Sequence, residues 1–205
     1  MVRRDGPRIL LETERLRLRE FVATDLNDLY ALNNDPVVMR FINGGMPTPL
    51  TDVRDRILAR YMELTRDGSA LGQWAAIERS SGLFIGRFGL IPRQADRVDE
   101  LDIGYRLRKE SWNRGYATEG ARALIRLAFD VIGADAVFAT TYEHNAASRR
   151  VMDKAGMRLL RRFRMTPEQL KNDGAHHAVG DQVWDGEDVE YVITREEWSQ
   201  IAAGC

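Results

Sequence analysis

The chain has 205 residues, of which 44% are hydrophobic and 30% charged, and its formal net charge is −1. This balance is typical of a globular protein that dissolves in water, and the length suits a single domain. A net charge so close to zero gives no electrostatic reason to expect binding to nucleic acid or to an anionic membrane. No segment approaches the roughly 20 apolar residues of a membrane-spanning helix.

The chain has few residues that could form disulfides or bind metals: one cysteine and three histidines. Cys205 is the single cysteine and cannot form a disulfide within the chain. The basic start is not followed by an apolar run, so a secretory signal is not expected, and we predict a cytoplasmic protein. His176 and His177 lack a further ligand at suitable spacing, so no metal is expected. Assembly into a homodimer is left open.

The first half of the chain alternates between strand and helix signals. Leu16 and Leu18 alternate with arginines, which predicts a half-buried strand over 9–19. Helix-start chemistry at Thr24 predicts a helix that ends at Pro36, and a second helix begins at Thr51. The following runs predict three strands, in the ranges 72–79, 83–91 and 98–107, of which the first two form a hairpin.

The second half continues with a helix over 116–132 and a strand over 135–142. A short helix over 146–155 is ended by Gly156. Two strands complete the pattern, in the ranges 157–164 and 188–194, and the polar stretch 165–187 between them has no predicted element. The order predicts a mixed α/β (α+β) fold: one domain over 1–205, with a mostly antiparallel sheet and helices on both faces.

The segment before the helix at 116 has the features of an anion site. It is rich in small and polar residues and follows a strand, with the order Trp112, Asn113, Arg114, Gly115, Tyr116, Ala117, Thr118 and Glu119. Backbone N–H groups at a helix start attract anions, and a glycine lets the backbone approach them closely. A pyrophosphate is the expected ligand. The plain alternative is a strand-to-helix turn that needed one glycine.

Neighbouring motifs extend this pattern. They are Ile103-Gly104-Tyr105-Arg106-Leu107, then the glycine segment, then Asn145-Ala146-Ala147-Ser148 and Lys154-Ala155-Gly156-Met157. Together they resemble the GCN5-related N-acetyltransferase (GNAT) superfamily, and in particular its RimJ/RimL-like branch of ribosomal-protein N-acetyltransferases. The resemblance is strong over 98–164 and looser at the opening strand, Thr13 to Arg19. It implies a GNAT-like domain that uses acetyl-CoA.

The resemblance also implies roles for particular positions. The backbone of 112–118 would bind the coenzyme A pyrophosphate, and the backbone of Tyr105, Arg106 and Leu107 would pair with the pantetheine arm. An N–H there would stabilise the developing oxyanion. Asn145 and Ser148 would lie near the thiol, with Ser148 assisting the departing thiolate. The alternative for Asn145 is that it only caps the short helix.

Proton transfer is the least determined part of the predicted chemistry. Many members of the superfamily carry a tyrosine four residues after the Ser148 position, where this chain has Met152. Glu100 and Asp102 alternate along the predicted central strand and therefore share one face. Either carboxylate could take the proton of the attacking amine, and the alternative is a solvated strand face. His144 is expected to have a structural or surface role.

The function predicted from the sequence is direct transfer of acetyl from acetyl-CoA to a primary amine. The acceptor would be a protein N-terminus, as the RimJ/RimL-like resemblance implies, or a small amine. The alternative is a non-catalytic acyl-CoA-binding sensor or interaction module on the same fold, because fold does not guarantee activity.

Overall fold

A computed structural model of the chain describes residues 6–95, 97–164 and 186–203. Within these residues eight strands form one sheet in the order β1-β2-β3-β4-β5-β6-β8-β7. Neighbouring strands are antiparallel except for β5 and β6. The strand bounds are β1 Ile9–Glu12, β2 Leu16–Arg19, β3 Gly72–Glu78, β4 Phe84–Pro92, β5 Glu100–Leu107, β6 Ala136–Tyr142, β7 Arg158–Phe163 and β8 Asp188–Thr194.

The helices are short, and two of them continue into π-helical turns. The helix bounds are α1 Leu26–Asn34, α2 Pro36–Asn43, α3 Leu50–Asp52, α4 Ala59–Leu64, α5 Tyr116–Leu127, α6 Ala146–Lys154 and α8 Arg195–Ala203. The π-helical turns are Val53–Leu58, between α3 and α4, and Ala128–Ile132, after α5. Single 3-10 turns occupy Ala23–Asp25 and Lys109–Ser111.

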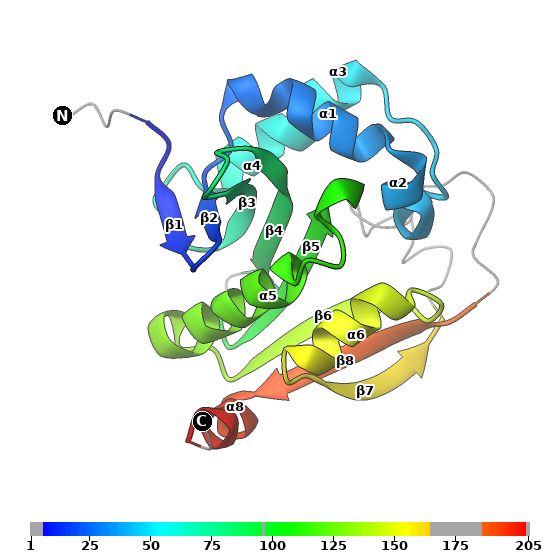
Figure 1. Ribbon diagram of the computed structural model, residues 1–205. Coiled ribbons are helices and arrows are strands. Elements are labelled where there is room, and N and C mark those ends of the chain that lie inside the picture. The colour runs from blue at the N-terminus through cyan, green and yellow to red at the C-terminus, as the bar shows by residue number, and fades with distance from the viewer. Residues whose placement is uncertain (1–5, 96, 165–185, 204–205) are drawn as a thin grey trace.

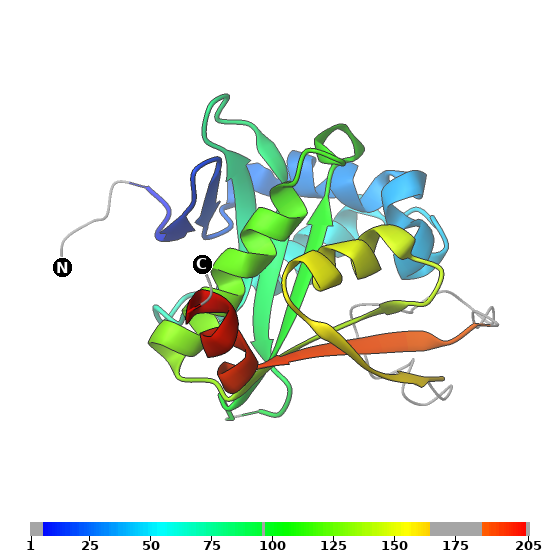
Figure 2. The same cartoon turned by 60° about the horizontal axis from the view of Figure 1, so that its bottom comes forward.

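Both faces of the sheet are covered by helices, as the sequence predicted. Figure 2 shows α5 and α6 in front of the sheet, with α1 and α2 behind it. β3 shows how the strands serve both layers: Trp74 and Ala76 pack in the core under α5, whereas Ala75 and Ile77 pack in the core under α1 and α2. The mixed, mostly antiparallel α/β fold is therefore confirmed. The extent of the domain, 1–205, stays a prediction.

Three elements differ from the sequence prediction. The segment 9–19 is a hairpin, β1 and β2, because the chain turns between Glu12 and Leu16. Pro36 begins α2 and does not simply end α1: the Asp35 carboxylate accepts hydrogen bonds from the N–H groups of Val37 and Val38, at 2.8 and 3.3 Å, and proline is well suited to the first helical position. The sequence prediction also missed α8 altogether.

The central parallel pair is short. β5 and β6 pair only over Glu100–Asp102 and Ala136–Phe138. β5 then continues to Leu107 and β6 to Tyr142, and Figure 1 shows the two strands diverging toward their carboxyl ends. α5 begins near the end of β5, and α6 lies over β6 (Figure 1). Beyond Asp102 and Phe138 the two strands are therefore unpaired, and this unpaired stretch, which includes residues that the sequence motifs single out, is called the gap below.

Candidate active site

The start of α5 has the geometry of an anion site. Gly115 precedes the helix with φ 83°, and Asn113 has φ 58°, so the loop turns sharply through two left-handed residues. The first hydrogen bond of the helix runs from the Glu119 N–H to the Gly115 carbonyl, at 3.0 Å. The N–H groups of the first turn therefore have no partner inside the helix. The predicted residues 112–115 are exposed on the surface beside them.

Two arginines flank this helix start. The guanidinium of Arg15, from the β1–β2 turn, lies 4.8 Å from the centre of the Tyr116 ring, and that of Arg114 lies 4.9 Å from it. Arg15 also donates a hydrogen bond to the Arg114 carbonyl, at 2.8 Å. Both side chains are about half exposed, at 43% and 53%. The sequence prediction named Arg114 for its backbone and missed Arg15, which is 99 residues away along the chain.

Carboxylates hold both arginines in place. Arg15 forms an ion pair with Glu119 at 2.5 Å, and Arg114 pairs with Glu78 at 2.9 Å. Burial opposes ionisation of Glu119, but hydrogen bonds from the Thr13 hydroxyl and from Arg15 hold its pKa below the ordinary value. The ion pairs thus hold both guanidinium groups in fixed orientations, which would reduce the entropy lost if they bound an anion.

The backbone of β5 beyond its pairing with β6 alternates in direction. The Arg108 N–H donates to the Ile85 carbonyl at 2.8 Å, so even-numbered residues of this strand direct their backbone groups to β4. The backbone groups of Tyr105 and Leu107 consequently point into the gap, whereas those of Arg106 point to β4. Of the three residues predicted to pair with a pantetheine arm, two have the required direction.

The side chain of Arg106 has a structural position. It is buried and donates a hydrogen bond to the Asn33 side chain of α1. Burial lowers the pKa of the guanidinium to about 9, and the neighbouring Arg87 contributes to the shift. Leu107 is linked to the predicted loop instead, because its carbonyl accepts a hydrogen bond from the Trp112 indole at 2.9 Å.

Tyr105 and Ser148 connect the two sides of the gap. The Tyr105 hydroxyl donates to the Ser148 carbonyl at 3.1 Å and lies 3.1 Å from the Ser148 Oγ. Burial raises the pKa of the tyrosine hydroxyl, although the hydrogen bond to Ser148 opposes the shift. The hydroxyl therefore stays protonated. The sequence prediction used only the backbone of Tyr105 and missed this contact, because residue spacing does not tell which helix lies above a strand.

Asn145 and Met152 have clear structural positions on α6. The Asn145 carbonyl oxygen accepts from the Ser148 N–H at 3.2 Å, and its amide donates to Thr141 at 3.1 Å, so Asn145 does cap this helix. Met152 is 2% exposed and belongs to the core under α5 and α6. Its thioether has no proton to give.

The predicted carboxylates lie near the paired end of β5 and β6. Glu100 and Asp102 each lie 4.0 Å from the Arg93 guanidinium, which confirms that they share a face of the strand. Arg93 in turn pairs with the buried Glu190 of β8, at 2.8 Å, and covers the ring of Phe138. The side chains of Glu100 and Asp102 are partly exposed, at 46% and 34%.

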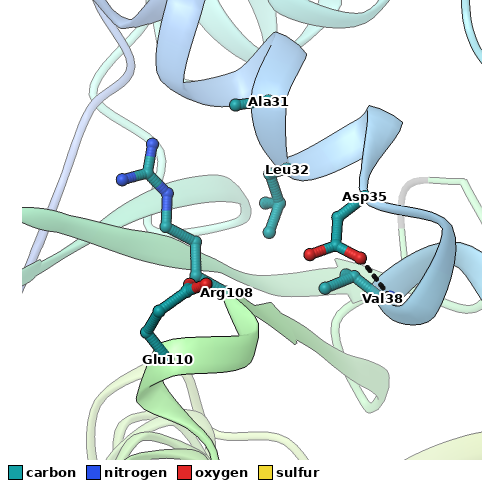
Figure 3. A pocket seen from close by; sticks show the side chains of 6 residues that line it. All are labelled: Ala31, Leu32, Asp35, Val38, Arg108 and Glu110. Carbon is teal, nitrogen blue, oxygen red and sulfur yellow. Dashed lines mark hydrogen bonds between the residues drawn. The ribbon is translucent and has the colours of Figure 1, made fainter.

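A pocket of about 320 Å³ lies on the α1 and α2 side of the sheet, beyond the carboxyl end of β5. Figure 3 shows side chains from α1 and α2 facing those of the segment after β5. Its lining residues are Ala31, Leu32, Asp35, Val38, Arg108 and Glu110. Arg108 also pairs with Asp28 of α1 at 2.6 Å. The pocket thus combines an apolar floor with charged edges.

The remaining candidates add little chemistry. His144 is exposed, and its ring lies edge-on to Tyr142 at 5.2 Å, in keeping with a surface role. His176 and His177 lie outside the described residues. Among those described, no group of three His, Cys, Asp or Glu side chains is placed to hold a metal ion. None of the described helices is long and apolar enough to cross a membrane.

Comparison with known proteins identifies the family. Residues 15–158 match the model of the acetyltransferase (GNAT) domain, which covers more than half of the chain, so the chain belongs to the GNAT acetyltransferase family. The chain is 33% identical to the uncharacterized protein YkkB of Bacillus subtilis over 149 residues, which are 72% of this chain and 84% of YkkB. It is 29% identical over 197 residues to an FsC-acetyl coenzyme A-N(2)-transacetylase of Aspergillus fumigatus, covering 93% and 78%.

Solved structures agree on the fold. A GNAT-family acetyltransferase of Bacillus anthracis superposes with a TM-score of 0.75 at 24% identity, covering 92% of this chain and 99% of that one. A RimL ribosomal L7/L12 α-N-protein acetyltransferase in complex with coenzyme A gives 0.72 at 13% identity, covering 91% and 98%. From its domain and from the N-acetyltransferases among its relatives, the chain is an N-acetyltransferase.

Proposed function

We propose that this N-acetyltransferase moves the acetyl group of acetyl-CoA directly to a primary amine. The observation that carries the proposal is that the start of α5, with its unpaired first-turn N–H groups, lies near the edge of β5 whose backbone groups turn away from β4. Gly115 leaves room for a pyrophosphate beside the first-turn N–H groups, and the half-exposed guanidinium groups of Arg15 and Arg114 offer further N–H donors. A pantetheine arm can then pair with Tyr105 and Leu107 as an added strand.

The residues around the gap are suited to the acyl-transfer step. An N–H group of Tyr105 or Leu107 would polarise the thioester carbonyl and stabilise the charge that develops on its oxygen. Ser148 would donate a hydrogen bond to the departing sulfur, with Tyr105 behind it. Asn145 would hold the first turn of α6 in position through its cap. For the proton of the amine the sequence singles out Glu100 and Asp102, and the structure adds a third carboxylate, which is compared with them below.

The acceptor is proposed to approach from the α1 and α2 side. A Cβ atom added at Gly104, which lies on that face of β5, would meet nothing within 4 Å, so the strand has open space there. The nearby pocket supplies carboxylates, Asp35 and Glu110, that suit a cationic amine. Both a protein N-terminus, as in the RimJ/RimL-like branch, and a small amine fit these features.

The test is release of free coenzyme A thiol from acetyl-CoA, in the presence of a panel of peptides with free N-termini, diamines and alkylamines. Turnover with one class of amine supports the proposal and names the acceptor. Acetyl-CoA binding without turnover across the whole panel would contradict it, and would favour the acyl-CoA sensor.

Ser148→Ala is expected to lower kcat about 10-fold or more and to leave the acetyl-CoA Kd nearly unchanged. The reason is that a hydrogen bond to the sulfur strengthens only as the thiolate forms. Tyr105→Phe, which removes one oxygen atom, is expected to lower kcat in the same direction. Steady-state kinetics and calorimetric titration with acetyl-CoA measure both quantities.

The double variant decides whether the two hydroxyls act together. If Tyr105 works through Ser148, Tyr105→Phe should have little further effect once Ser148 is alanine. Additive losses would separate the two residues, and an unchanged kcat in Ser148→Ala would make water the proton source.

A further inference from the structure

A buried carboxylate without any assigned role lies on the strand next to β6, one strand away from the gap. Asp188 is the first residue of β8 and lies opposite Tyr142, the last residue of β6. It is 7% exposed. Its Oδ1 atom is buried and has no hydrogen-bond partner within the part of the chain that the structure describes. A buried polar atom without a partner is costly, so its presence calls for an explanation.

The side chain of Asp188 lies on the acceptor side of the sheet. Residues directly opposite one another in an antiparallel pair share a face, so Asp188 lies on the same face as Tyr142. The ring of Tyr142 lies 6.0 Å from that of Phe41 in α2, which places this face toward α1 and α2. The other face of the gap is bridged by Tyr105 and Ser148 beneath α6.

Asp188 is thus separated from the gap by β6 alone, and it lies on the face from which the acceptor is proposed to approach. The pairing of β6 with β5 ends at Phe138, four residues before Tyr142, and Gly104 leaves space on the same face of β5. Glu100 and Asp102 also lie on this face, but at the closed end of the gap, where the strands are paired and Arg93 lies near both. Asp188 lies at the open end.

The surroundings of Asp188 keep it a usable proton acceptor. Burial raises the pKa of its carboxyl to about 6, and the charge of Glu143 adds to the shift. Glu143 is itself held by Arg162, at 3.0 Å, and by the Glu187 N–H, also at 3.0 Å. Other charged or titratable groups nearby are His144 on the β6–α6 turn, Arg149 of α6, whose guanidinium donates to the Glu143 carbonyl at 3.2 Å, and Glu190 on β8. Among the described residues, no cationic side chain forms an ion pair with Asp188.

We propose that Asp188 is the carboxylate that accepts the proton of the attacking amine, either directly or through one water molecule. This rests on the proposed function. The ammonium group of the acceptor gives one proton to Asp188, and the freed lone pair forms the new C–N bond at the thioester carbon. The C–S bond then breaks with its electron pair going to sulfur, and the second amine proton passes to that sulfur. Asp188 returns its proton to solvent.

The experiment compares Asp188→Asn with the wild type in turnover against pH. The wild-type kcat/KM should fall below about pH 6 as Asp188 becomes protonated. This acidic limb of the pH–rate profile is well separated from the ionisation of the acceptor amine, near pH 8 or above. Asp188→Asn should lower kcat/KM about 10²-fold at neutral pH and lose the limb near pH 6. The acetyl-CoA Kd should stay within about 2-fold, because the residue lies on the acceptor side.

Stability gives a readout that is independent of turnover. A carboxyl whose pKa is raised by folding contributes stability below its unfolded pKa, and this contribution is lost as the pH rises through about 6. Asp188→Asn should therefore melt above the wild type at about pH 7 and show no such gain near pH 4. A variant that gains stability while it loses turnover indicates that the charge is retained for activity.

Two further variants keep the proposal falsifiable. Asp188→Glu restores the carboxylate and should recover the limb near pH 6, which also serves if the asparagine variant does not fold. Glu100→Gln and Asp102→Asn should retain that limb. The proposal is overturned if Asp188→Asn keeps the wild-type rate and profile, or if the limb disappears in Glu100→Gln or Asp102→Asn instead. If the wild type turns over no amine although it binds acetyl-CoA, the proposed function itself has failed.

Discussion

Gly115→Asp is expected to weaken acetyl-CoA binding by about 10²-fold or more. The substitution places a carboxylate where the pyrophosphate would lie against the first turn of α5, and like charges in contact cost several kcal/mol, with 1.4 kcal/mol for each factor of ten. The new Cβ would also come within 3.2 Å of the Arg15 guanidinium, so the carboxylate can compete for that cation. Calorimetric titration with acetyl-CoA measures the loss directly.

Gly133→Asp is the matched control. Gly133 is exposed, has φ 89° against 83° for Gly115, and a Cβ added there would meet nothing within 4 Å. The two variants therefore share the backbone strain and the added charge, but Gly133 follows the far end of the helix. Acetyl-CoA should still raise the melting temperature of Gly133→Asp. Unchanged affinity in a folded Gly115→Asp would show that the pyrophosphate lies elsewhere.

Gly86→Ala is expected to destabilise the protein by about 3 kcal/mol, which combines strain at a backbone angle that suits glycine with overpacking against β5. Gly86 has φ 147°, and an added Cβ would collide with the Arg106 carbonyl and lie 2.7 Å from the Leu107 Cα. These are backbone atoms of the strand proposed to hold the pantetheine arm, so they cannot move aside without shifting it. The melting temperature should fall by about 6–12 °C, and the acetyl-CoA Kd should rise.

Gly82→Ala separates strain from collision. Gly82 lies in the β3–β4 turn with φ 71°, and an added Cβ there would meet nothing within 4 Å. It should lose only the cost of its backbone angle, on the order of 1 kcal/mol, with no change in acetyl-CoA affinity. Equal losses in the two variants would mean that β4 and β5 can separate without harm to the site.

Local patterns in the sequence were sufficient for most of the elements. The alternation at Leu16 and Leu18 predicted β2, and both side chains are fully buried. Pro36 misled because the same residue can end one helix or begin the next, and the deciding contact is a cap from the preceding aspartate. The helix α8 was missed, although Trp198 packs against Phe129 at 6.2 Å, because a contact between distant segments leaves no periodic signal.

In the candidate site, too, residues in contiguous motifs could be predicted, whereas residues brought together by the fold could not. The loop around Gly115 and the position of Ser148 lie on contiguous motifs, and both could be named before the structure. Arg15 and Asp188 could not, because their importance arises from neighbours about a hundred and about forty-five residues away along the chain. Burial is what raises the pKa of Asp188, and the sequence does not show it: the same aspartate on an exposed strand end would have an ordinary pKa.

The short parallel pairing between β5 and β6 affects the rigidity of the middle of the sheet. Among the described residues, five strands lie on one side of it and three on the other, and three residues of each central strand make up the strand pairing between the two halves. An acyl-CoA bound along β5 would take the place of a strand between β5 and β6. It would make this weakly paired region of the sheet more rigid. Amide hydrogen exchange at Tyr105 and Leu107 should therefore slow markedly when acetyl-CoA is added, whereas the amides of β3 should change little.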